Sequence, residues 1–138
     1  MDIDARGPRF GAALTTAVLA VVLITGSFWL LAWQTLAFAL GAAGGVGRSP
    51  YGWLFRKAVR PRIGPSTEFE APEPPRFAQA VGLVFALVGL VGFGLGPEWL
   101  GLAATGAALA AAFLNAAFGY CLGCEMYLLV RRVTVRAQ

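Results

Sequence analysis

The sequence predicts an all-α fold, an integral-membrane four-helix bundle made of two hairpins. Hydrophobic residues make up 58% of the 138 residues and charged residues only 13%, whereas about a quarter of a soluble domain is charged. Three stretches, 10–43, 77–95 and 99–124, contain no acidic or basic side chain. Uncharged runs of about 18 or more residues are typical of transmembrane helices. We therefore expect the whole chain, 1–138, to form one transmembrane domain.

The lengths of these stretches set the number of spans. One helix over 10–43 would be about 50 Å long, which exceeds the ~30 Å hydrocarbon core of a bilayer. The small polar cluster at 25–27 divides it, and glycine, proline and tryptophan between 94 and 99 divide the second half. The predicted spans are 10–25, 28–44, 77–95 and 98–124, and the last continues as a helix toward Val133.

The positions of the basic residues predict the orientation. All 11 Lys and Arg residues lie in the segments 6–9, 48–76 and 131–136, which four spans place on one side. Cytoplasmic segments retain Lys and Arg, so we expect a multi-pass protein of the cell membrane with both termini in the cytoplasm. Because topology accounts for the positive charge, we do not expect nucleic-acid binding.

The central loop carries a mixed aromatic and basic segment at 50–60. It predicts a short helix in the headgroup region, with a lipid-interface set of Trp53, Arg56, Lys57 and Arg60. Docking of an acidic soluble partner is the alternative. The proline-rich, acidic linker 64–75 is expected to have no regular structure.

The two hairpins resemble each other in sequence. Each begins with Pro-Arg-Phe, at 8–10 and at 75–77, and each continues through an apolar span and a glycine-containing turn to Trp-Leu, at 29–30 and 99–100. The pattern indicates a parallel internal repeat or chance convergence on one way of starting a membrane helix.

Small residues predict where the spans pack. They recur on one face of the third and fourth helices, and backbones approach closely at such faces in lipid. The expected packing positions are Gly82, Gly89, Gly92, Gly96, Ala104, Ala108, Ala112 and Ala116.

Cys121 and Cys124 are the only cysteines and form a Cys-x-x-Cys pair near the cytoplasmic interface. On a continuous helix, Glu125 and Arg132 share their face, and Gly123 leaves room for a close approach. Asn115 points about 120° away, on a helix with 3.6 residues per turn, as interhelical glue or a ligand contact. Cys124, nearer the interface, is the expected attacking thiol, and the deeper Cys121 would resolve the mixed disulfide.

Three interpretations of the pair remain open. The first is thiol-disulfide exchange or sulfur handling with a thioredoxin-like or sulfur-carrier protein. The second is metal binding, which would need further ligands from a second copy of the chain or from carboxylates, since there is no histidine and no other cysteine. The third is simple packing, which would make the protein a structural or accessory subunit of a membrane complex. We expect no metal and no cofactor within one chain, and a homo-oligomer stays open.

The segment from 118 to 124, Phe-Gly-Tyr-Cys-Leu-Gly-Cys, together with the four spans, resembles a family of small bacterial integral membrane proteins known as a domain of unknown function. The family motif is matched by Gly119, Tyr120, Cys121, Gly123 and Cys124. The resemblance implies a bacterial inner-membrane protein and supplies no activity. A looser similarity is to vitamin K epoxide reductase-like thiol oxidases. This chain lacks their second cysteine pair, which argues against quinone-linked disulfide formation.

The sequence therefore predicts a membrane protein with a cytoplasm-facing dithiol. It leaves open whether the protein is an enzyme, because a complete oxidoreductase normally carries its own electron acceptor or a second thiol pair.

Overall fold

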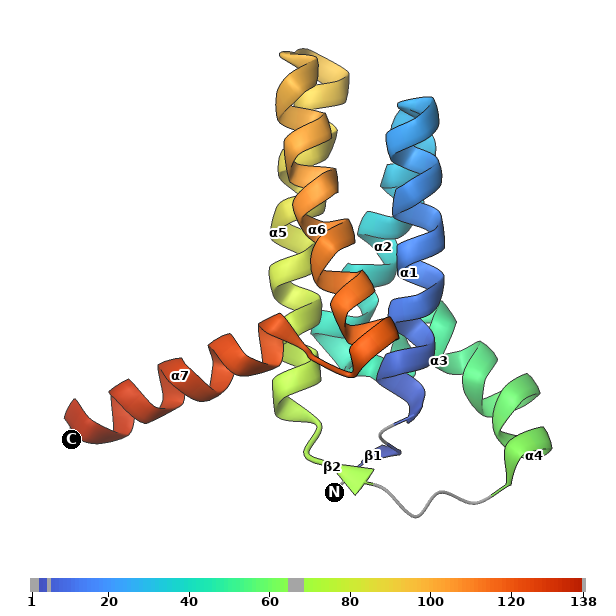
Figure 1. The fold of residues 1–138 in the computed structure, drawn as a ribbon, viewed down its shortest axis with the longest axis vertical. Coiled ribbons are helices and arrows are strands. Elements are labelled where there is room, and N and C mark those ends of the chain that lie inside the picture. Colours follow the sequence, from blue (N-terminus) through green and yellow to red (C-terminus); the bar gives the residue numbers. More distant parts are fainter. Residues whose placement is uncertain (1–2, 5, 65–68, 138) are drawn as a thin grey trace.

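The computed structural model describes residues 3–4, 6–64 and 69–137, and these residues are almost entirely helical. Four long helices lie side by side (Figure 1): α1 (Arg6–Thr25), α2 (Phe28–Gly44), α5 (Glu73–Leu95) and α6 (Glu98–Phe118). Helix α1 packs on α6, α6 on α5, and α5 on α2. Helices α1, α5 and α6 are long and apolar enough to cross a membrane, whereas the apolar α2 has 17 residues. The structure is thus compatible with a membrane protein.

Local sequence explains the turn between α1 and α2. Gly26 adopts a positive φ of 65°, which an L side chain rarely tolerates. Ser27 then caps α2, because its Oγ accepts the Leu30 N–H at 3.2 Å. This turn and the one between α5 and α6 lie together at the end opposite to the chain termini (Figure 1).

The centre of the bundle is an apolar core to which all four long helices contribute. Its buried members are Leu19, Val22, Leu31, Phe38, Ala86 and Ala108. Helices α5 and α6 approach most closely at Gly92, where a Cβ would overlap the backbone of Gly101. Gly92 is therefore a packing position, as the sequence predicts. Gly96 is not: it ends α5 with a φ of 86°.

A chain of hydrogen bonds crosses the interior on the α1–α2 side. The Gln34 amide donates to Thr15 Oγ1 at 3.4 Å, and Tyr51 Oη donates to Gln34 Oε1 at 2.6 Å. The Trp33 indole N–H donates to Tyr51 Oη at 3.1 Å. Burial raises the pKa of Tyr51, and the bond from Trp33 partly opposes that rise. These bonds satisfy polar groups that would otherwise be costly to bury.

The segment after α2 is helical, but it is held partly by protein contacts. It comprises η1 (Val46–Arg48), α3 (Pro50–Leu54), the π-helical turn η2 (Phe55–Val59) and α4 (Arg60–Ile63). Ser49 caps α3 by accepting the Tyr51 N–H at 3.1 Å. Tyr51 packs near Gly11, and Phe55, only 3% exposed, contacts the ring of Phe10 at a centroid distance of 5.7 Å.

The described part of the 64–75 linker departs from the expected irregular chain. Residues 65–68 lie outside the described part. The strand β2 (Phe69–Glu70) pairs antiparallel with β1 (Ile3–Asp4), and α5 already begins at Glu73. Charge attraction supports this end of the molecule, because Asp4 forms an ion pair with Arg6 at 2.9 Å. No sequence pattern predicts a strand pair of two residues each.

The largest difference from the sequence prediction concerns the fourth span. One helix was expected over 98–124, continuing toward Val133. Instead α6 ends at Phe118, and α7 (Leu122–Ala137) leaves the bundle at a steep angle (Figure 1). Its outer turns are exposed and alternate apolar residues with Arg131 and Arg132.

We predict that Gly92→Ala destabilises the protein by about 1–3 kcal/mol, since a methyl group there must push α5 away from the α6 backbone. Gly106→Ala is the matched control: it also lies inside a helix, but its Cβ would meet nothing within 4 Å. The control should keep or raise the thermal unfolding midpoint in detergent. Equal midpoints for the two variants would contradict the close contact.

Candidate functional site: a disulfide beside a cavity

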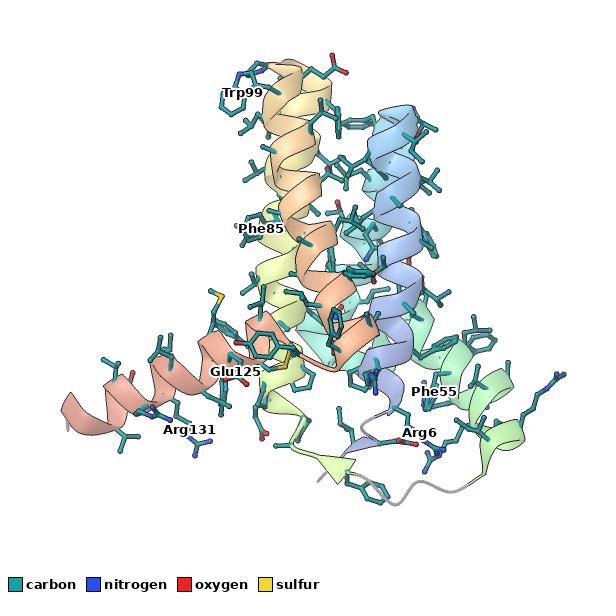
Figure 2. The ribbon with its side chains drawn as sticks, in the orientation of Figure 1. Arg6, Phe55, Phe85, Trp99, Glu125 and Arg131 are labelled. Carbon is teal, nitrogen blue, oxygen red and sulfur yellow. A yellow bond between two sulfur atoms is a disulfide. The ribbon has the colours of Figure 1, made fainter. Side chains whose placement is uncertain are left out.

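The two cysteines form a disulfide at the junction of α6 and α7, with their Cα atoms 5.1 Å apart. This separation lies in the range that a disulfide bridges. The bond lies against the base of the bundle, close to Glu125 (Figure 2). The fold therefore brings the two predicted cysteines together. Their geometry differs from the predicted one, in which both cysteines would lie on one continuous helix.

Gly119 produces this geometry by ending α6. It adopts the left-handed conformation (φ 69°, ψ 15°), and its N–H donates to the Asn115 carbonyl at 3.0 Å. The Tyr120 N–H then reaches back to the Leu114 carbonyl at 3.2 Å. Both bonds use carbonyls that the end of a helix would leave unpaired. The next residue, Cys121, is thereby turned away from the α6 axis.

Cys121 occupies the position of a helix cap at the start of α7. Its carbonyl accepts the Glu125 N–H at 3.0 Å, and its Sγ accepts the Cys124 N–H at 3.1 Å. A hydrogen-bond donor and the positive end of a helix both favour a thiolate at this sulfur once the disulfide is reduced. Cys124 lies within the first turn, and among the described residues its sulfur accepts no hydrogen bond, so Cys121 is the better stabilised of the two as a thiolate.

Gly123 holds the first turn of α7 against α5. A Cβ at this position would lie 2.6 Å from the Cα of Ala78, so no larger residue fits without moving the helix. Tyr127 continues the contact one turn later, with its ring centroid 5.6 Å from that of Phe77. The first turn of α7 is thus fixed, and the disulfide with it.

A cavity of about 540 Å³ opens beside the disulfide, with walls from all four long helices and from the start of α7. Its volume falls within the range of about 300–1,000 Å³ that is usual for small-molecule sites. Ala108, Ala111 and Ala112 of α6 form one wall, and Phe38 and Phe85 contribute aromatic surface. Both cysteines lie in its lining.

Arg9 lies at the same end and was not among the predicted site residues. Its Nη2 donates to the Ala116 carbonyl at 3.2 Å, and its guanidinium lies 3.7 Å from where a Cβ of Gly119 would be. It also lines the cavity, together with Arg6 and Gln79. The only sequence signal for Arg9 was its place in Pro-Arg-Phe, more than 100 residues before the cysteines.

The predicted auxiliary residues separate in the structure. Asn115 lines the cavity with the cysteines, although a continuous helix would point it away from them. Glu125 is exposed in the first turn of α7. Arg132 lies eight residues further along the helix than Cys124, about 12 Å at 1.5 Å per residue, which exceeds the ~8–10 Å screening length of physiological salt. Arg132 therefore has little effect on the sulfurs.

The four residues predicted for the lipid interface, Trp53, Arg56, Lys57 and Arg60, are all exposed on the segment after α2, which lies on the opposite side of the bundle from α7 (Figure 1). Arg56 Nη2 donates to the Gly47 carbonyl at 2.8 Å. Within the described part of the chain, no three His, Cys, Asp or Glu side chains converge as a metal site would require.

We predict that Gly123→Ala makes the disulfide easier to reduce. The added methyl group must lift α7 from Ala78 and open the first turn to solvent. The rate of reduction by dithiothreitol should rise several-fold. Alkylation of the freed thiols and mass spectrometry measure this rate. Leu128→Ala, on an exposed face of the same helix, is the control. A rate equal to that of the control would show that this contact does not protect the disulfide.

In a comparison with protein families, residues 3–132 match the family DUF4395, which is described as a domain of unknown function. No curated protein and no solved structure matches the chain.

Proposed function

Because that match covers nearly the whole chain, the protein belongs to the DUF4395 family, whose description gives no activity, and we propose a function from its own geometry. The proposal is thiol-disulfide exchange, or transfer of sulfur, between Cys121 and Cys124 and a soluble protein at the cytoplasmic face of the bacterial inner membrane. The observation that carries it is the hydrogen bond from the Cys124 N–H to Cys121 Sγ at the N-terminus of α7.

The arrangement of the charged segments supports the membrane topology. The basic residues lie at the start of α1, in the segment from η1 to α4, at the start of α5 and in α7, and all of these parts lie at one end of the long helices (Figure 1). The two turns at the other end carry none. Four spans with both termini in the cytoplasm agree with the retention of Lys and Arg on that side. Helix α2, with 17 residues, is at the short limit and spans a locally thinned bilayer.

Helix α7 supports a cytoplasmic interface for the disulfide. It begins where a membrane-capable helix ends, and it carries Met126, Leu129 and Val133 at spacings that place them on one side. We place this helix in the headgroup layer with its arginines toward lipid phosphates. The segment 50–60 takes a similar place, anchored by Tyr51 and Phe55.

Cys121 is the attacking thiol in this proposal. The opposite assignment from sequence depended on a helix that continued through both cysteines. As the thiolate, Cys121 attacks the disulfide of a thioredoxin-like partner, and one partner thiolate leaves. Cys124 then attacks the Cys121 sulfur and releases the second partner thiolate, which leaves the Cys121–Cys124 disulfide and a reduced partner. The oxidised protein and a partner dithiol run the same steps in reverse.

We predict that Cys124→Ser traps a covalent partner. Without Cys124 the mixed disulfide on Cys121 cannot be resolved, so an adduct that dissociates on reduction should accumulate in membranes. Cys121→Ser is the matched control and should trap at least tenfold less. Adducts are measured by non-reducing electrophoresis and mass spectrometry.

The reverse pattern would restore Cys124 as the attacking thiol and keep the chemistry. If neither variant traps a protein and neither cysteine reacts with a membrane-permeant alkylator, the exchange proposal is wrong. The protein would then be a structural subunit whose cysteines only pack.

We predict that reporters fused at the C-terminus and within 64–75 are cytoplasmic, and that a reporter at Gly96 is external. Fusions to green fluorescent protein report cytoplasmic positions, and fusions to alkaline phosphatase report external positions. A cytoplasmic signal at Gly96 would contradict the four-span topology.

We also propose that the two hairpins are a parallel repeat. Arg9 at the start of α1 donates to a carbonyl at the end of α6, and Arg76 at the start of α5 donates to the Ala42 carbonyl at the end of α2, at 2.7 Å. Gly11 of α1 faces Tyr51 of α3. In the same way, Ala78 of α5 faces Gly123 of α7. Arg9 and Arg76 are 67 residues apart, and so are Gly11 and Ala78, so the two pairs of contacts start from matching positions in the two hairpins.

A further inference from the structure

The cavity beside the disulfide has two chemically different ends. Its depth is apolar, from the alanine wall of α6 and the rings of Phe38 and Phe85. Its mouth, at the end where the chain termini lie (Figure 1), is lined by Arg6, Arg9, Gln79 and Asn115. Among the described residues that line it there is no Asp or Glu.

The positive charge at the mouth is only partly neutralised. Arg6 is paired with Asp4 at 2.9 Å. Arg9 forms no ion pair within the described residues and uses one of its five N–H groups on the Ala116 carbonyl. A guanidinium with free donors is the group that binds carboxylates most effectively. The cavity therefore complements a negative head group attached to an apolar body.

We propose that this cavity binds a long-chain carboxylate, with the head group at Arg9 and the hydrocarbon chain along the alanine wall. The volume of about 540 Å³ holds one such chain, whereas a phospholipid with two chains is too large. The alanines that form the wall leave a smooth surface, as an unbranched chain requires. Bound in this way, the ligand lies over Cys121 and Cys124 and covers them from the side of the cavity.

The proposal does not depend on thiol exchange. Binding uses Arg9 and the apolar wall, so it persists in a variant without cysteines. It adds a consequence for the disulfide: an occupied cavity limits the approach of a reductant or a partner. A membrane that is rich in free carboxylate would then slow the chemistry proposed for the two cysteines.

Photolabelling in vesicles tests the site directly. The full chain is reconstituted in phosphatidylcholine vesicles with a palmitate that carries a diazirine near its terminal methyl group, and labelled residues are mapped by mass spectrometry. We expect labels on 107–112 of α6, which excess unlabelled palmitate removes. The corresponding alcohol, with the same chain and no charge, should label these residues about tenfold less, because it lacks the negative charge that strengthens hydrogen bonds from a guanidinium.

Two variants separate the roles of charge and space. Arg9→Gln should lower carboxylate labelling about tenfold and leave labelling by the alcohol unchanged. Arg62→Gln, an exposed arginine on α4 outside the cavity, is the matched control and should change neither. Ala111→Leu fills the wall and should reduce labelling by both probes.

Two labelling results would overturn the proposal. Labelling of α6 that is equal for the carboxylate and the alcohol would overturn the proposal in favour of a neutral lipid. Labels confined to exposed faces of the helices, such as Leu87 and Val91 of α5, would show that the cavity takes no chain. Should Arg9→Gln fail to fold, the comparison of the two probes on the unmodified protein still decides. The Cys121→Ala, Cys124→Ala double variant should bind palmitate as the unmodified protein does, so failure of thiol exchange would leave this result intact.

Discussion

The left-handed turn at Gly119 is the constraint on which the site depends. If α6 continued by one more turn, both cysteines would lie on a helix surface, and neither sulfur would meet a free backbone N–H. Because α6 stops, Cys121 becomes the cap of a new helix, and its Sγ accepts the Cys124 N–H at 3.1 Å. The same stop directs α7 away from the bundle and leaves the mouth of the cavity uncovered. One backbone conformation thus creates the sulfur environment and the access to it.

Much of the fold follows from sequence because a few strong signals agree. Charge-free stretches indicate membrane-capable helices, and glycine with small polar residues marks the turn at 25–27. Packing through Gly89, Gly92, Ala104 and Ala108 follows from small residues at helical spacing, and these positions are indeed buried. Such arguments need only local composition and periodicity, which one sequence contains.

The site was less predictable, for physical reasons. Gly119 and Gly123 look alike in the motif, yet one ends a helix by its φ and the other packs on Ala78 by its lack of a side chain. An apolar run shows no charge pattern at a helix break, so the continuous span to 124 was the natural prediction. The contribution of Arg9 depends on a contact across the bundle that only the three-dimensional structure reveals.

The helix cap at Ser49, compared with the helix cap at Cys121, has a further consequence. The two residues begin α3 and α7, the helices that follow the second helix of each hairpin, and each side chain accepts a backbone N–H. Behind Ser49, the ring of Tyr51 and the amide of Gln34 fill the interior. Behind Cys121, glycine and alanine leave it hollow. A scaffold with two similar helix junctions can assign rigidity to one and chemistry to the other, so that loss of packing at the reactive junction is tolerated by a fold stabilised at the other.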